Sequence, residues 1–257
     1  MSNRYLSFID DEKLEFFVKK VINTYEKGIK KSETDLFSNV IDPFFGLFES
    51  SYHNISLEEW LTTTEKARKV GKTLANAIGE FHENILGCAK GWEKLPVGGV
   101  IDLKCDSKRI IAEVKNKFNT TKGNDKTLRY DDINSLLNKE YSGYTGYFVE
   151  IVPKNPPYDR PFTPPDNSIG RMIKNAKASN DLLAANKLSE QHHRTLNENI
   201  RQIDGRSFYS LVFENPTALE ELYMILPEVI AKVLSTKTDL IASDKYFREF
   251  FSRAYRV

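Results

Sequence analysis

Charged residues interrupt the most β-prone part of this sequence. Residues 100–105 and 110–118 are two apolar, β-branched runs separated by turn-forming residues, a pattern that predicts a β-hairpin. Glu113 and Lys115 lie two positions apart in the second run, so they point to the same face. The hairpin can place Asp102, in the first run, beside them. The sequence therefore predicts that two carboxylates and one ammonium group converge.

This combination of groups suits phosphodiester hydrolysis. Carboxylates prefer hard divalent cations, and a site with only two or three of them suits Mg²⁺ that is bound together with a substrate phosphate. The lysine supplies a fixed positive charge where negative charge develops at phosphorus, and it can orient or deprotonate an attacking water.

The acid-x-Lys spacing alone is not specific. It also occurs at Asp11/Lys13, Asp102/Lys104 and Asp106/Lys108. Only Glu113/Lys115 lies within a long apolar strand, where two charges are costly unless they face a functional cleft. The alternative is that Glu113 and Lys115 lie on the solvent-exposed face of a surface hairpin, where such charges have no functional role.

A third acid lies on the helix expected over residues 72–86. Glu80 is close to the apolar stripe of that helix, and it is our choice for one more carboxylate at the site, with Glu83 in reserve. An acid on the helix surface is the alternative for both.

The net charge conceals an uneven distribution. The 257 residues include 37 Lys+Arg and 36 Asp+Glu, a formal charge of +1. Residues 104–129 carry eight basic and three acidic side chains, a balance of +5 that leaves −4 for the rest. This segment fits a cleft for a polyanion, or an ordinary solvated hairpin. Holding nucleic acid by bulk positive charge is excluded.

The remaining chain reads as mostly helical. No run reaches the roughly 18 to 20 apolar residues of a membrane span, and the N-terminus lacks a signal-peptide core, so we expect a cytosolic protein without a membrane partner. Further strands are expected at residues 144–152 and 207–213. Helices are expected at residues 14–25 (after Asp10 and Asp11), 36–48 (interrupted near Pro43), from Ser56 onward, 131–140, 217–234 and 243–255. Residues 153–170 are expected to form a Pro-rich excursion, and residues 171–199 to be helical or loosely ordered.

The segments around these residues resemble a known family. Asp-x10-Glu-x-Lys on paired strands resembles the PD-(D/E)xK nuclease superfamily. The surrounding sequence segments are similar to a family of Type II restriction endonucleases that cut GGNCC or GGWCC sites, and the similarity extends over about residues 75–227. These segments are NAIGEFHENILG (76–87), GWE (91–93), IAEVKNKFNTTKG (111–123), TPPDN (163–167) and DGRSFY (204–209).

The resemblance implies a fold and a set of roles. The fold would be α/β, a restriction-endonuclease-like core in which helices flank a mixed central β-sheet, with an N-terminal helical region. One domain would comprise a helical region (1–70), a nuclease core with the catalytic hairpin (71–152), and a recognition excursion with closing helices (153–257). Asp102 and Glu113 would be metal ligands, Lys115 the catalytic lysine and Glu80 the helix acid, and the Val114 carbonyl could complete a Mg²⁺ shell. Ile101 replaces the usual proline before Asp102.

Candidate DNA contacts fall in two groups. Residues directly after the site could bind phosphates, although a surface loop explains them as well: Asn116, Lys117, Asn119, Thr120 and Lys122. Residues of the excursion and of the later basic segment could read bases, for which arginine bound to guanine is the commonest contact. The alternative is that they are ordinary polar residues of surface loops. These residues are Arg160, Asn167, Arg171, Arg201 and Arg206.

The leading hypothesis is a Mg²⁺-dependent Type II site-specific deoxyribonuclease. It would cut double-stranded DNA at a short palindromic, GC-rich, GGNCC-like site within a restriction-modification system. A palindrome implies a homodimer, and the system implies a cognate DNA methyltransferase. The alternatives are a structure-specific repair nuclease and a non-catalytic DNA-binding protein on a nuclease-like scaffold.

Overall fold

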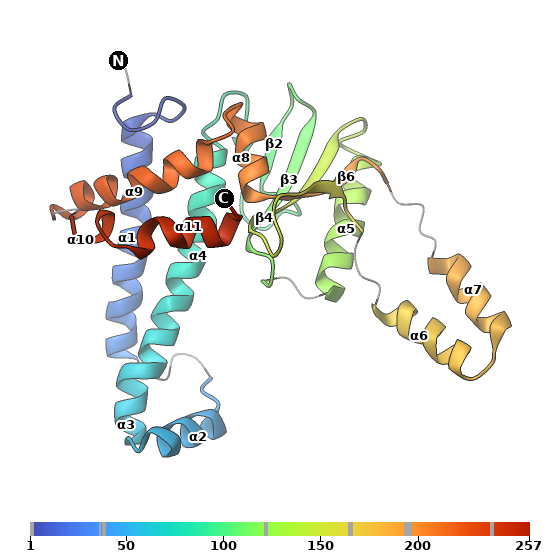
Figure 1. Ribbon diagram of the computed structural model, residues 1–257, viewed down its shortest axis with the longest axis horizontal. Helices are drawn as coiled ribbons and strands as arrows, with labels where there is room; N and C mark the ends of the chain where they lie inside the picture. Colours follow the sequence, from blue (N-terminus) through green and yellow to red (C-terminus); the bar gives the residue numbers. More distant parts are fainter. Residues whose placement is uncertain are drawn as a thin grey trace. The chain divides into compact units, whose positions relative to one another are not determined.

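The chain forms two compact units in a computed structural model (Figure 1). The structure describes residues 3–35, 37, 40–120, 123–163, 167–192, 197–236 and 239–257. One unit comprises Met1–Ile85 and Ile225–Ala242, and the other comprises Leu86–Met224 and Ser243–Val257.

The first unit is helical, as predicted for the N-terminal region. Asp10 caps its first helix by accepting hydrogen bonds from the backbone N–H groups of Glu12 and Lys13, and Ser56 caps a later helix by accepting from the N–H of Glu59 at 3.0 Å. Its elements are α1 (Asp11–Thr34), α2 (Pro43–His53), α3 (Leu57–Trp60), a π-helical turn (Leu61–Glu65), α4 (Lys66–Leu86), α10 (Asp239–Ala242) and the later part of α9 (Ala218–Leu234).

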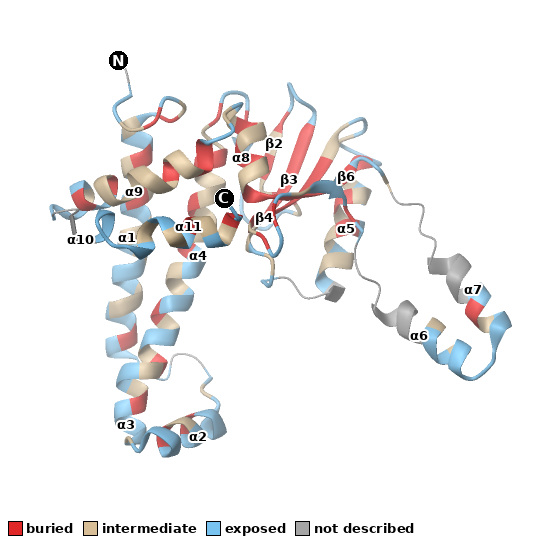
Figure 2. Ribbon diagram, viewed as in Figure 1, coloured by how far each residue is buried: buried red, intermediate tan, exposed pale blue. Residues whose placement is uncertain are grey.

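Helix α2 differs from its prediction. Pro43 begins the helix instead of interrupting one, because the first turn needs no N–H from that residue, and Asp42 caps the end. Leu36, the expected start, lies outside the described residues. Figure 2 shows α2 mostly in the colour of exposed residues.

The second unit is built on a mixed six-stranded sheet with the order β1-β2-β3-β4-β6-β5, which confirms the predicted α/β architecture. β3, β4 and β6 are parallel, whereas β1–β2, β2–β3 and β5–β6 are antiparallel pairs. The strands are β1 (Glu93–Lys94), β2 (Leu103–Cys105), β3 (Ile110–Lys117), β4 (Thr145–Val152), β5 (Asp159–Pro161) and β6 (Ile200–Asp204). The predicted hairpin is therefore β2–β3.

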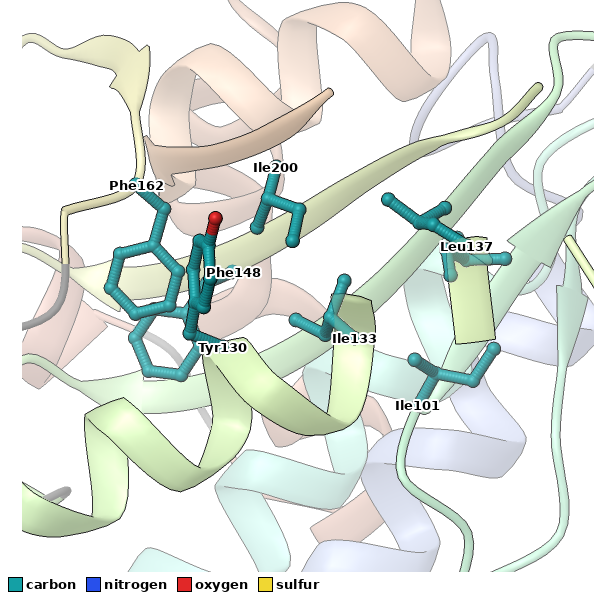
Figure 3. Close-up of a cluster of buried hydrophobic side chains, with 8 residues drawn as sticks. Ile101, Tyr130, Ile133, Leu137, Phe148, Phe162 and Ile200 are labelled. Carbon is teal, nitrogen blue, oxygen red and sulfur yellow. The ribbon is translucent and has the colours of Figure 1, made fainter. Parts of the chain in front are cut away.

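Helices cover both faces of this sheet. On one face, α5 (Gly123–Leu137) buries Tyr130 and Ile133 against Phe148 of β4 (Figure 3). On the other face, Phe208 of α8 (Gly205–Phe213) packs on the Tyr147 ring, with 5.8 Å between ring centroids. The remaining helices of this unit are α6 (Asn167–Ala178), α7 (Leu182–His192), the first part of α9, and α11 (Tyr246–Tyr255).

Two further assignments made from the sequence were wrong. Residues 207–213, predicted as a strand, form α8, because the Asp204 carboxylate accepts the backbone N–H of Ser207 and caps a helix there. The strand is the preceding segment, β6. Helix α5 begins at Gly123 and not near residue 131, so part of the expected polar loop is helical. In the part of the chain that the structure describes, no helix is long and apolar enough to cross a membrane.

Candidate active site

The backbone of the hairpin fixes Asp102. Its N–H donates to the carbonyl of Ala112 at 2.9 Å, and its carbonyl accepts from Leu95 at 2.8 Å. Its carboxylate Oδ2 accepts the N–H of Val114 at 2.7 Å. The side chain of Asp102 is thereby held against β3, beside Glu113.

Glu113 and Lys115 share one face of β3, as their spacing predicts. The Lys115 ammonium lies 2.5 Å from Glu113 Oε1. The Glu113 side chain is 4% exposed, whereas that of Lys115 is 30% exposed. The structure thus brings Asp102, Glu113 and Lys115 together, with the lysine on the solvent side.

The surroundings of Glu113 disfavour the charged form of its carboxyl group. Burial, and after it the neighbouring Asp102 carboxylate, raise the pKa of Glu113 to about 7, although the Lys115 ammonium acts in the opposite direction. A buried carboxylate beside another carboxylate is costly unless a cation compensates it.

A second polar cluster lies on the same face of the sheet, and the sequence reading missed it. Glu150 of β4 is the register partner of Lys115 and is 2% exposed. Its carboxylate accepts from Lys126 Nζ at 2.5 Å, from the Tyr158 hydroxyl at 2.5 Å, and from Gln202 Nε2 at 2.9 Å. A buried acid within a strand was the available signal, but its partners come from α5, β6 and the segment before β5.

Arg129 is a further cation at the site. It lies one helical turn after Lys126 on α5, and its Nε is 3.8 Å from Glu113 Oε1. Its Nη1 lies 3.3 Å from Asp132, and the side chain is 33% exposed. From the sequence, Arg129 could be recognised only as a basic residue, because the helix that directs it toward Glu113 was predicted to begin after residue 129.

Two of the predicted base-reading residues, Arg160 and Arg201, contact neighbouring protein side chains. The Arg160 guanidinium donates to Gln202 Oε1 at 3.2 Å and stacks over the Tyr158 ring, while Arg201 pairs with Asp159 at 2.6 Å. Nε of Arg206 is buried, and it has no hydrogen-bond partner among the residues described. Asn167 and Arg171 lie on α6, and their side chains fall outside the description.

The predicted phosphate contacts follow β3 directly. Lys117, Asn119 and Thr120 are exposed, and Thr120 closes a turn by donating from its N–H and its hydroxyl to the Lys117 carbonyl. Asn116 is half-buried at the end of the strand. Lys122 lies outside the described residues.

Glu80 belongs to the first unit. It lies on α4, where its carboxylate pairs with Lys20 of α1 at 2.6 Å and is 41% exposed. Its place at the active site therefore stays a prediction. Within the described ranges, no group of three His, Cys, Asp or Glu side chains is arranged to hold a metal ion.

Comparison with known proteins identifies the chain. A protein-family model described as the Eco47II restriction endonuclease matches residues 6–235 of this chain. The chain belongs to this family. It is 37% identical to the Type II restriction enzyme Eco47II of Escherichia coli over 97% of this chain and 98% of that enzyme. It is 29% identical to the Type II restriction enzyme Sau96I of Staphylococcus aureus over 92% of this chain and 84% of the relative.

Family membership confirms the predicted class of enzyme. The chain is a Type II restriction endonuclease, an enzyme that cleaves DNA at specific sites in restriction-modification, and its mixed sheet with flanking helices is a restriction-endonuclease-like core. The Asp102, Glu113 and Lys115 cluster lies on the hairpin within the matched residues.

Proposed function

We propose that this enzyme hydrolyses both strands of DNA at a short palindromic, GC-rich, GGNCC-like site, with Mg²⁺ as its cofactor. The observation that carries the chemistry is the convergence of Asp102, Glu113 and Lys115 at the hairpin. The similarity to two Type II restriction enzymes supports the choice of DNA and of a specific site.

The two carboxylates fit a hard divalent cation. Asp102 and Glu113 would hold it, with the backbone carbonyl of Val114 as a further oxygen ligand, and water or a DNA phosphate would supply the rest. Burial and the neighbouring Asp102 carboxylate raise the pKa of Glu113, and a bound cation would offset this cost of keeping Glu113 charged. Bound there, Mg²⁺ would polarise the scissile phosphate and neutralise part of its charge.

Lys115 would assist the water that attacks phosphorus. Its ammonium lies on the solvent side of Glu113, where it can orient that water and stabilise the charge that develops on the phosphate oxygens. In the reaction, a water oxygen bonds to phosphorus and loses one proton to solvent, while one ester P–O bond breaks and the leaving oxygen takes up a proton from solvent.

Arg129 would bind the same phosphate group as a second cation. Its guanidinium contacts Glu113 at 3.8 Å, longer than a hydrogen bond, and is one-third exposed, so a phosphate oxygen can approach it. We expect Arg129→Ala to lower kcat by about 100- to 1,000-fold, the usual effect of removing one group that stabilises charge in the transition state. Single-turnover cleavage of a DNA with one site measures this directly.

The matched control for Arg129 is Arg253→Ala. Arg253 also pairs with a carboxylate, that of Glu249 on α11, but it is 78% exposed. This control should cleave at the wild-type rate, and Arg129→Lys should retain intermediate activity, since lysine keeps the charge but loses the planar donors. Unchanged cleavage by Arg129→Ala would remove Arg129 from the mechanism.

Cleavage of defined DNA tests the proposed function itself. A linear DNA carrying GGNCC sites should yield discrete fragments in the presence of Mg²⁺ and none in EDTA, while a copy with one base pair of each site changed should stay intact. Cutting of branched DNA without regard to sequence would favour a structure-specific nuclease instead.

The biological setting is part of the same proposal. We propose a homodimer that presents one active site to each strand, since two-fold protein symmetry matches a two-fold site. A cognate DNA methyltransferase would protect the host's own sites, and both enzymes would work in the cytoplasm, where the DNA lies.

A further inference from the structure

Helix α2 is packed with its small residues inward and its large ones outward. Gly46 and Ser50 are its buried residues. By contrast, Phe44, Phe48 and Tyr52 follow one another at every fourth position, and their exposures are 69%, 74% and 86%. Leu47, at 54%, completes this exposed stripe.

The inverted orientation is fixed by specific contacts. An added Cβ at Gly46 would lie 3.0 Å from the Trp60 ring, so a small residue is needed on this side. The Trp60 Nε1–H donates to Glu49 at 2.6 Å, and the Arg68 guanidinium lies 4.2 Å from the Phe45 ring centroid. These contacts hold α2 with the stripe facing outward, and they would be lost if the helix rotated to bury it.

The exposed stripe has the size and chemistry of a subunit interface. With about 200 Å² for each fully exposed large side chain, the stripe offers roughly 600 Å² of surface. That is the upper end for the largest apolar patch of a monomer, and it approaches the roughly 800 Å² that each partner contributes to a standard interface. The four side chains carry no charge, which is typical of homodimer interfaces.

We propose that two copies of this chain pair through the Phe44, Leu47, Phe48 and Tyr52 stripe around a two-fold axis. An uncharged apolar stripe is complementary to itself, so the same patch on both copies can close the contact without repulsion. The proposal rests on the homodimer of the proposed function and names its surface.

Sedimentation of the full chain, without DNA or metal, tests the stripe. The wild type should sediment as a dimer at micromolar concentration. Phe48→Glu should raise the dissociation constant of the dimer by at least about 100-fold, because it places a charge in the apolar contact of both copies. Phe16→Glu is the matched control, since Phe16 of α1 is 63% exposed on the same unit, and it should remain a dimer.

Cysteine crosslinking provides a second, positional readout. Phe48→Cys should form a covalent dimer on mild oxidation, whereas Phe16→Cys should not. A monomeric wild type, or a Phe48→Glu variant that stays dimeric while Phe48→Cys fails to crosslink, would overturn the stripe as the interface. A dimer that obeys these expectations but cuts no DNA would leave the interface intact and contradict the proposed function instead.

Discussion

Lys115→Ala should lower the rate of DNA cleavage by about 1,000-fold, the upper end of the effect of removing one group that stabilises charge in the transition state. The ammonium is the part of the Asp102, Glu113 and Lys115 cluster that faces solvent, 2.5 Å from Glu113. Its removal leaves the two carboxylates without their nearest cation. Single-turnover cleavage of DNA with one site, at saturating enzyme, separates this chemical defect from weaker binding.

The control lies on the same hairpin. Lys104 belongs to another acid-x-Lys pair, and it contacts Glu93 and Asp106 away from the cluster. Lys104→Ala should therefore cleave normally. Lys115→Ala should still shift the same DNA in a gel and melt near the wild-type temperature, because a buried Glu113 that loses its partner can take up a proton. Cleavage by Lys115→Ala within tenfold of wild type would reject Lys115 as the catalytic lysine.

Gly205→Ala should destabilise the second unit by about 3 kcal/mol or more, the upper range for overpacking a core. A Cβ at this position would lie 2.3 Å from the carbonyl oxygen of Ile151 and 2.6 Å from its Cα. Both are backbone atoms of β4, which cannot move aside as the end of a side chain can. For a unit of this size, thermal unfolding should shift down by at least about 6 °C.

A second glycine provides the comparison. Gly71 lies within α4, and a Cβ there would meet no atom within 4 Å. Gly71→Ala should be neutral or should stabilise the protein by up to about 1 kcal/mol, because alanine favours the helix. Equal melting temperatures for Gly205→Ala and the wild type would show that α8 can shift away from β4.

The active-site hairpin was predictable because all its information is local. Asp102, Glu113 and Lys115 lie within fourteen residues, and strand alternation with a short turn is sufficient to bring them together. The cations that α5 adds were not predictable in this way. Lys126 and Arg129 reach the site only because α5 packs across the sheet on Phe148, a contact between segments distant in sequence.

The error over β6 has a similar origin. Its five residues include Arg201, Gln202 and Asp204, and so lack the apolar run that predicts a strand. The polar side chains of β6 are satisfied by tertiary contacts, such as that of Gln202 with Glu150. The aromatic run that follows attracted the strand assignment, although Phe208, Tyr209 and Val212 have helical spacing.

The two outer strands of the sheet limit how copies of the enzyme can associate. β1 has only two residues, and β5 has three, which include Arg160 and Pro161. Short strands, charges and proline are poor templates for another strand, since proline has no N–H to offer. Extension of the sheet from one copy into the next is therefore disfavoured at both ends, which protects against edge-to-edge aggregation and leaves helical surfaces for assembly.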